Sequence, residues 1–405
     1  MNIIVVGGGA SGLVASYFFA KNGNSVTLIE QNEKLGKKLY ITGKGRCNLT
    51  NDCDVETFLN NVVSNPKFLL SSIYGFTPND TMEFFTSLGL TLKTERGNRV
   101  FPLSDKSSDV IKVLERALIK LNVNINLNEK VTELIVENNV AIGVKTDLSE
   151  YFGDKVVIAT GGISYKSTGS TGDGYKFARD TGHTVTDLKP SLCGFNLKGE
   201  EYKQLQGLNL KNVNLTAYDG KKKYFSEMGE MLFTHFGISG PLVLTCSALT
   251  TRRDLNNIKI CIDLKPALSE KELDNRVLRD LQLNINKELK NSLDALLPKA
   301  LIPIIINRAK INPYKKCNTI TFDERERLVK VLKNLDYELL SLRDFTEAII
   351  TSGGVSVKNI NPSTMESKIV KGLYFIGEVL DVDAFTGGFN LQIAFSTAKS
   401  ATNDN

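Results

Sequence analysis

A glycine-rich turn near the start of the chain constrains its fold more than any other feature. The β-branched run at 2–6 predicts a buried strand, and the sequence GGGASG follows directly at 7–12. An apolar helix is predicted over about 11–21, and a second strand over 25–29 ends at Glu30. A strand, a helix and a second, parallel strand form a βαβ unit. The sequence therefore predicts a parallel sheet with a Rossmann-like nucleotide-binding turn.

The turn fits the G-x-G-x-x-G pattern of dinucleotide sites. Gly7 permits the tight turn, Gly9 lets the backbone approach a pyrophosphate, and Gly12 lets the helix pack on the sheet. The helix N-terminus presents free N–H groups and the positive end of its dipole to the phosphates. Glu30, 18 residues after Gly12, is expected to accept hydrogen bonds from both ribose hydroxyls.

Later segments favour FAD over NAD. A buried strand is predicted just before Gly377 and Glu378, and the sequence GGFN at 387–390 precedes a helix over about 391–400. The N-terminus of this helix would stabilise negative charge on a reduced flavin. A further strand with a small-residue turn at 157–162 is expected to pass beneath the adenine side.

The pattern of the sequence changes twice along the chain. After about residue 190, short alternating segments predict antiparallel β structure, and helical stretches follow over roughly 269–290 and 324–342. From about residue 345 the glycine-rich, β-branched pattern returns. We therefore predict an FAD-binding domain in two parts, 1–190 and 346–405, interrupted by an inserted substrate domain at 191–345.

The composition excludes several classes of protein. With 41% hydrophobic and 23% charged residues, the chain has the composition of a folded globular protein. No apolar run approaches the roughly 18 residues that span a bilayer, so no membrane association is predicted. Six scattered cysteines without a CxxC pair and only two histidines predict reduced thiols, a cytoplasmic location and no metal site.

The net charge of +5 is unevenly placed. Residues 191–345 contain 25 Lys+Arg and 19 Asp+Glu, whereas the rest of the chain contains 25 and 26. No acidic residue occurs between Asp294 and Asp323. A basic patch can bind phosphates, although a merely solvated lysine-rich face is the alternative. The cations of this stretch are Lys299, Arg308, Lys310, Lys315 and Lys316.

The segment 36–51, with the sequence GKKLYITGKGRCNLTN, concentrates cations, glycines and amide donors just after Glu30. Here the chain closely resembles the BaiN/YhiN-type FAD-binding flavoproteins, also called aminoacetone oxidase-like, and the resemblance covers essentially the whole chain. Lys44 stands where this family often has glycine, and Thr42 where it often has serine. The other motifs that carry the resemblance are RVFP at 99–102, GSTGDG at 169–174, LFTHFGISGP at 232–241, TSGGV at 351–355, TMESK at 364–368 and the C-terminal unit.

The resemblance implies an α/β fold with a glutathione-reductase-type, Rossmann-like FAD domain, interrupted by a β-barrel-like plus helical insertion. It also implies three chemistries. Members are associated with reducing conjugated C=C bonds of bile-acid enones, with reducing uracil to dihydrouridine in large-subunit ribosomal RNA, and with oxidising small amines. Each passes hydride to or from flavin N5.

We predict an FAD-dependent oxidoreductase that reduces the uracil 5,6 double bond of ribosomal RNA. NAD(P)H is the expected electron donor and would bind transiently, because no second G-x-G-x-x-G follows a strand. A small-molecule enone reductase and an amine oxidase are the alternative enzymes. A ribosome-associated flavin-binding factor is the alternative that is not an enzyme.

Cys47 and His235 are the candidate catalytic residues, because reduction of a C=C bond also requires a proton donor. Nearby cations are expected to lower the pKa of Cys47. A packing role for Cys47 and a structural role for His235 are the alternatives. The predicted FAD-binding residues are Gly7, Gly9, Ala10, Ser11, Gly12, Glu30, Lys38, Gly45, Arg46, Cys47, Val131, Thr160, Gly161, Gly377, Glu378, Asp381, Gly388, Asn390 and Leu391.

Overall fold

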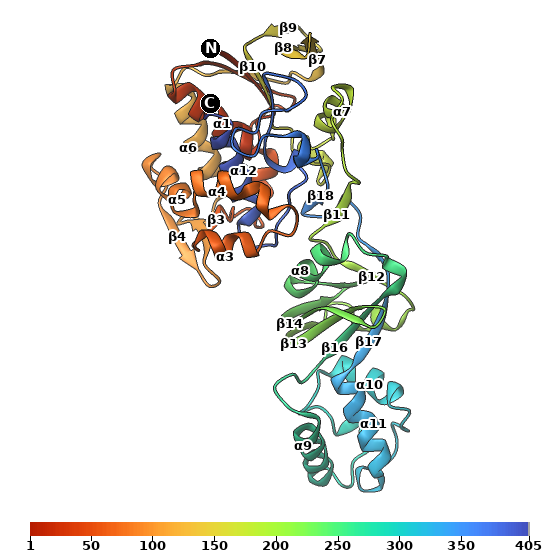
Figure 1. The fold of residues 1–405 in the computed structure, drawn as a ribbon. Coiled ribbons are helices and arrows are strands. Elements are labelled where there is room, and N and C mark those ends of the chain that lie inside the picture. The colour runs from red at the N-terminus through yellow and green to blue at the C-terminus, as the bar shows by residue number, and fades with distance from the viewer. Residues whose placement is uncertain (404–405) are drawn as a thin grey trace. The chain divides into compact units, whose positions relative to one another are not determined.

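The structure, a computed structural model, describes residues 1–403 and divides into two compact units (Figure 1). The first unit combines Met1–Ser191 with Phe345–Asn405, and the second unit is Leu192–Asp344. The second unit is therefore inserted between two parts of the first. The domain boundaries expected from the sequence lie one residue from these limits, whereas a substrate-binding role for the insertion stays a prediction.

The centre of the first unit is a five-stranded parallel sheet in the order β19-β10-β1-β2-β6. The β-branched and aliphatic residues of its inner strands β1 and β10 and of β19 are mostly buried because helices cover a parallel sheet on both faces, whereas the edge strand β6 is partly exposed. The predicted α/β fold class with a Rossmann-type parallel sheet is confirmed. The strands are β1 (Asn2–Val6), β2 (Ser25–Glu30), β6 (Asn124–Leu127), β10 (Lys155–Ile158) and β19 (Leu373–Phe375).

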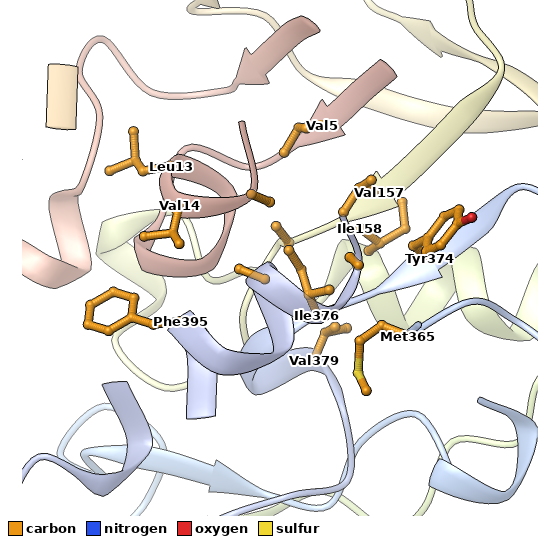
Figure 2. Packing of buried hydrophobic residues seen from close by; sticks show 14 of the residues in the cluster. Val5, Leu13, Val14, Val157, Ile158, Met365, Tyr374, Ile376, Val379 and Phe395 are labelled. Carbon is orange, nitrogen blue, oxygen red and sulfur yellow. The ribbon is translucent and has the colours of Figure 1, made fainter. Parts of the chain in front are cut away.

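The core of this unit joins the sheet to helices from both ends of the chain. Figure 2 shows Leu13 and Val14 of α1 (Ala10–Lys21) and Phe395 of α12 (Phe389–Ser400) among side chains that include Val5 and Val157. All five are fully buried. Burying each such side chain contributes about 1.5–3 kcal/mol, so the sheet fixes the N-termini of both helices at its carboxyl edge.

Smaller elements complete the first unit. The additional helices are α2 (Lys37–Ile41), α3 (Val55–Asn60), α4 (Leu70–Gly75), α5 (Pro78–Ser87), α6 (Ser107–Lys120) and α7 (Asp173–Asp180). Three small sheets consist of β3 (Thr50–Asn51), β5 (Arg99–Pro102) and β4 (Leu92–Glu95); of β7 (Val131–Glu137), β8 (Val140–Thr146) and β9 (Glu150–Phe152); and of β11 (Lys189–Ser191) and β18 (Ile350–Ser352).

The second unit contains a closed six-stranded antiparallel barrel in the order β12-β15-β14-β13-β16-β17. This confirms the expected barrel. Its strands are β12 (Phe195–Leu197), β13 (Asn209–Asp219), β14 (Lys222–Phe233), β15 (Gly237–Ser239), β16 (Ile258–Asp263) and β17 (Leu335–Leu342). Its helices are α8 (Pro241–Thr250), α9 (Glu270–Leu283), α10 (Ile302–Arg308) and α11 (Phe322–Lys333).

The helices predicted for this unit are too long at their C-terminal ends. The helix predicted over 269–290 ends at Leu283, and the helix predicted over 324–342 ends at Lys333. Residues 335–342 form a strand because Leu335, Tyr337 and Leu339 alternate into the barrel core. The second half of that helix prediction is therefore wrong.

Candidate flavin-binding site

The turn between β1 and α1 requires its three glycines for different reasons. Gly7 has a φ of +106°, and a Cβ on it would lie 2.7 Å from the Ala159 carbonyl oxygen. A Cβ on Gly12 would overlap the Gly7 carbonyl oxygen. A Cβ on Gly9, by contrast, would have no described atom within 4 Å. Gly7 and Gly12 are thus required by the fold, whereas Gly9 leaves open space beside the backbone, which fits the pyrophosphate role predicted for it.

The N-terminus of α1 offers the hydrogen-bond donors that a pyrophosphate needs. Gly9 is the N-cap residue and provides no side-chain cap. The first N–H groups of a helix have no partner within the helix, and the helix dipole is positive there. Ala10 is half-buried and Ser11 is buried at this end. The geometry fits an anionic group at the N-terminus of α1.

Glu30 ends β2 with a carboxylate that is 8% exposed and held in place. Its Oε2 accepts a hydrogen bond of 2.7 Å from the Gly8 N–H, and its Oε1 accepts one of 2.8 Å from the Asn32 N–H. The carboxylate is fixed beside the glycine turn, where the ribose of a dinucleotide lies in a Rossmann site.

Sequence reasoning missed the residues that follow Glu30. The Gln31 side chain donates to the Gly169 carbonyl at 2.6 Å, and the Asn32 side chain donates to the Thr168 carbonyl at 3.1 Å. The loop that precedes α7 is thereby joined to the end of β2. No spacing rule links 31–32 to 168–169, so only the fold reveals this contact.

The strands β10 and β19 both end at the carboxyl edge of the parallel sheet. Gly161 and Gly377 have φ values of +72° and +71°, and a Cβ on Gly377 would lie 2.6 Å from Ser11 Oγ. Thr160 is half-buried, and its Oγ1 has no hydrogen-bond partner in the structure. Because these turns lie at the carboxyl ends of adjacent parallel strands, they border the position where Rossmann folds bind their ligands.

Lys38 and Glu378 form an ion pair that ties four segments together. Lys38 Nζ lies 2.6 Å from Glu378 Oε2 and 2.8 Å from Ser164 Oγ. Glu378 Oε1 also accepts a hydrogen bond of 3.0 Å from the Thr351 N–H. Each charged side chain is 23% exposed. The structure therefore shows both predicted residues together, holding the turns around the site.

The N-terminus of α12 closes the other side of this region. Gly388 is its N-cap residue with a φ of +101°, and a Cβ there would overlap the Thr50 carbonyl. The Asn390 carboxamide accepts a hydrogen bond from the Ala384 N–H and donates one to the Ala384 carbonyl. Asn390 therefore positions the loop before α12. Asp381 is buried in that loop, and Leu391 is half-buried.

The segment after α2 approaches α12 through Thr50, whose hydroxyl donates to Gln392 Oε1 at 2.6 Å. Gly45 is held by the Ser107 N–H, which donates to its carbonyl at 2.8 Å. Asn48 precedes β3, and its buried Oδ1 has no hydrogen-bond partner in the structure. Two orphaned polar atoms, Asn48 Oδ1 and Thr160 Oγ1, thus lie beside the turns just described. A polar ligand would satisfy them.

The Arg46 guanidinium forms ion pairs with two carboxylates of its own unit. Its Nη2 lies 2.5 Å from Glu95 Oε1 and 2.5 Å from Asp105 Oδ1, and its guanidinium lies 4.1 Å from the Phe101 ring centroid. Hydrogen bonds to Glu95 and Asp105 raise the pKa of Arg46. These contacts hold the glycine-rich loop in place, and direct binding of FAD by Arg46 stays a prediction.

Cys47 is fully buried and has a φ of +58°. Burial raises the pKa of its thiol above the ordinary value. The expectation that nearby cations lower this pKa is wrong, because the side chain lies inside the core and Arg46 points to its own carboxylates. A Cys47 thiol in this position stays protonated at neutral pH.

The last two predicted residues lie in different units. Val131 is buried at the start of β7, two residues after Glu129, whose N–H donates to the Glu30 carbonyl at 3.1 Å. His235 belongs to the second unit, is exposed, and meets the Phe236 ring edge-on at 5.1 Å. The structure thus links Val131 to the end of β2, and the catalytic role of His235 stays a prediction.

The glycine turn, the two uncapped helix N-termini, the fixed Glu30 carboxylate and the orphaned polar atoms fit a bound dinucleotide with a flavin. They define a protein with a Rossmann-type dinucleotide-binding site. The sequence matches the family described as "HI0933-like protein Rossmann domain" over residues 1–404. The chain belongs to this family and is an FAD-dependent oxidoreductase.

Curated relatives align along nearly the whole chain. A 3-dehydro-bile acid delta(4,6)-reductase of Clostridium scindens is 31% identical, with 97% of this chain and 96% of the relative covered. A ribosomal RNA dihydrouridine synthase of Haemophilus influenzae is also 31% identical, with 98% and 96% covered. The solved 3-ketosteroid-delta4-(5alpha)-dehydrogenase of Rhodococcus jostii matches at a TM-score of 0.54 and 15% identity, covering 99% of this chain and 96% of that one, which shows a shared fold.

Two structural features are absent from residues 1–403. No helix there has both the length and the apolar character that crossing a membrane requires. Within the same residues, no group of three or more His, Cys, Asp or Glu side chains is arranged to hold a metal ion.

Proposed function

We propose that this protein reduces a conjugated C=C bond, and that its substrate is uracil in large-subunit ribosomal RNA. Relatives that are 30–31% identical over almost the whole chain are named ribosomal RNA dihydrouridine synthases in Haemophilus influenzae and Escherichia coli. When bound, FAD supplies the hydride chemistry of such a reduction.

The observation that favours RNA over a small enone is the charge of the second unit. It contains 25 Lys+Arg and 19 Asp+Glu, a net charge of +6, whereas the rest of the chain has a net charge of −1. In the acid-free stretch, Lys299, Lys310 and Lys316 are exposed. An excess of exposed lysines attracts a polyanion, and the phosphate backbone dominates the affinity of proteins for nucleic acids.

Two cations of this stretch are neutralised within the unit. Arg308 lies 2.9 Å from Glu201 and 3.1 Å from Asp336, and Lys315 lies 2.7 Å from Glu324. The basic surface is therefore smaller than the sequence suggests, and its RNA-binding role depends on the three exposed lysines.

For the proton that the second carbon of the double bond requires, we propose Cys47 as donor. Cys47 lies in the glycine-rich segment that adjoins the turns of the site, and a donor role requires its buried Sγ to become accessible to the substrate. His235, in the second unit, is the alternative donor. We further propose NAD(P)H as the electron donor and the cytoplasm as the location, where the six free cysteines would remain reduced.

A second candidate function is reduction of a steroid-like enone, which the similarity to the Clostridium scindens reductase favours. Amine oxidation and a flavin-binding role in ribosome assembly are the two remaining hypotheses. The modified nucleosides of ribosomal RNA from wild-type and deletion cells distinguish these proposals.

Nucleosides of large-subunit ribosomal RNA should be measured by mass spectrometry in wild-type and deletion cells. Loss of dihydrouridine on deletion is expected, with recovery on expression of the wild-type protein but not of Gly9→Val, which removes the space for the pyrophosphate. Unchanged dihydrouridine in the deletion cells would contradict the RNA proposal and favour the enone reductase.

A further inference from the structure

Two segments of the second unit run side by side in opposite directions. The Leu289 N–H donates to the Lys315 carbonyl at 2.9 Å, and the Cys317 N–H donates to the Lys287 carbonyl at 3.0 Å. These two bonds flank the antiparallel bridge between Glu288 and Lys316. We refer to residues 285–290 and 313–318 together as the 288/316 ribbon.

The ribbon has an inner and an outer face. Leu289 and Cys317 are buried in the core of the unit. Side chains alternate between the two faces of an extended ribbon, so the neighbours of these buried residues point outward. Glu288 and Lys316 are directly opposed residues of a non-hydrogen-bonded pair, in which side chains lie close together.

The outer face presents an aromatic ring beside cations. Tyr314 is 64% exposed, and Lys290 Nζ lies 4.0 Å from its ring centroid. Lys290 Nζ also lies 3.2 Å from Glu288 Oε2. This ion pair neutralises Glu288, which is the single acidic residue of the ribbon. Lys316 is exposed. The lysine fixes one side of the ring, and the remaining ring surface faces solvent.

Charge favours an anionic partner at this face. At the outer positions, Lys290 and Lys316 outnumber Glu288. Lys287 is exposed at an alternate position and adds positive charge to the ribbon, whereas Lys315 is paired with Glu324. At the other end of the ribbon from Tyr314, Ile285 is 48% exposed and its carbonyl accepts a hydrogen bond from the Asn318 N–H. An exposed ring among lysines is the combination that binds single-stranded nucleic acid, because bases stack on the ring and phosphates bind the cations.

We propose that the 288/316 ribbon is a binding surface for single-stranded RNA, with a base stacked on Tyr314 and a phosphate at Lys316. This inference rests on the proposed function, because it names the surface by which an RNA substrate would be held. It places RNA recognition on this ribbon and not on the acid-free stretch as a whole.

Fluorescence anisotropy with an oligouridine of about 12 nucleotides tests the stacking. Tyr314→Ala should weaken binding about 5- to 150-fold, the range expected for loss of one base–aromatic stack, whereas Tyr314→Phe should bind like wild type. Tyr74→Ala is the matched control, because Tyr74 is 65% exposed in the other unit. Thermal unfolding of each variant should match wild type, since both rings are mostly exposed.

The salt dependence of binding tests the phosphate contact. Lys316→Ala should reduce the slope of log affinity against log salt by about 0.7, the value for one phosphate of a single strand, and Lys316→Arg should retain it. Lys120→Ala, at an exposed lysine of the first unit, should leave the slope unchanged.

Equal affinity of wild type, Tyr314→Ala and Tyr74→Ala would overturn the inference, as would a wild-type protein that binds no oligouridine. A second result would also overturn it: Tyr314→Ala no longer binds ribosomal subunits but binds oligouridine like wild type. The surface would then contact a ribosomal protein and not RNA. The proposed function is decided separately, by the dihydrouridine content of deletion cells.

Discussion

The two units differ in what their surfaces offer a ligand. The first unit, with 25 basic and 26 acidic residues, gathers uncapped helix N-termini and a buried carboxylate at one edge of a parallel sheet. The second unit has a net charge of +6 and exposes Tyr314 and lysines on a barrel-and-helix body. The comparison teaches that the first unit offers a dinucleotide a backbone of suitable shape, whereas the second unit offers a polyanion an excess of positive charge.

The largest expected effect is loss of FAD from the first unit. Substitutions of two glycines in the same turn distinguish loss of the cofactor from loss of the fold. Gly9→Val should fold and lose FAD, because its side chain enters the open space beside the α1 N-terminus. Gly12→Val should lose both FAD and the native fold, because its Cβ would overlap the Gly7 carbonyl. Flavin absorbance and circular dichroism of the purified proteins measure the two outcomes. Stoichiometric FAD in Gly9→Val would show that the pyrophosphate lies elsewhere.

Next in size is the contribution of the fixed carboxylate. Glu30→Ala should weaken FAD binding by about 1–3 kcal/mol, because hydrogen bonds to the ribose are lost and the Gly8 N–H loses its acceptor. Glu33→Ala removes an exposed carboxylate three residues away and should bind FAD normally. Titration of the apoprotein with FAD gives both affinities. Equal losses in the two variants would refute the placement of the ribose at Glu30.

A smaller effect is expected at the ion pair that holds the turns. Lys38→Met should lower the free energy of unfolding by about 2–3 kcal/mol, because Glu378 keeps a largely buried charge without its partner. Lys37→Met breaks a pair with Glu33, which is 58% exposed, and should cost much less than Lys38→Met because solvent screens an exposed pair. Urea unfolding of the holoprotein measures both. Similar costs for both substitutions would argue against a structural role for the Lys38–Glu378 pair.

The smallest effect is a pH dependence that comes from Cys47. Its pKa is raised by burial in the folded state, whereas in the unfolded chain it should be about 8.5. Ionisation then favours the unfolded chain, so Cys47 should lower the free energy of unfolding by about 1.4 kcal/mol for each pH unit above about 8.5. Urea unfolding of wild type and Cys47→Ala at several pH values compares the slopes. Identical slopes would show that the thiol is not buried.

Local patterns in the sequence are sufficient to predict the βαβ unit that carries the glycine turn. The glycine turn between β1 and α1 depends on residues within one βαβ unit, where spacing fixes both the backbone conformation and the helix N-terminus. The barrel was expected only through a family resemblance. Leu335–Leu342 is predicted as helix from the sequence because it directly follows the helical pattern of α11. Its alternating apolar residues form a strand only because the segment pairs with β12 and β16.

Side-chain partners distant in sequence could not be predicted. Arg46 forms ion pairs with Glu95 and Asp105, which lie about 50 and 60 residues later in the sequence. A cation expected to face FAD therefore stabilises its own loop instead. Burial of Cys47 depends on the packing of the whole unit, which reversed the predicted direction of its pKa shift.

Reoxidation of the reduced holoprotein by RNA tests the central claim most directly. The protein, reduced without oxygen, should be mixed with deproteinised large-subunit ribosomal RNA while flavin absorbance and dihydrouridine are followed together. We predict that the oxidised flavin spectrum returns and that one dihydrouridine forms for each flavin reoxidised. A flavin that stays reduced with RNA but is reoxidised by a conjugated steroid enone would contradict the proposed substrate.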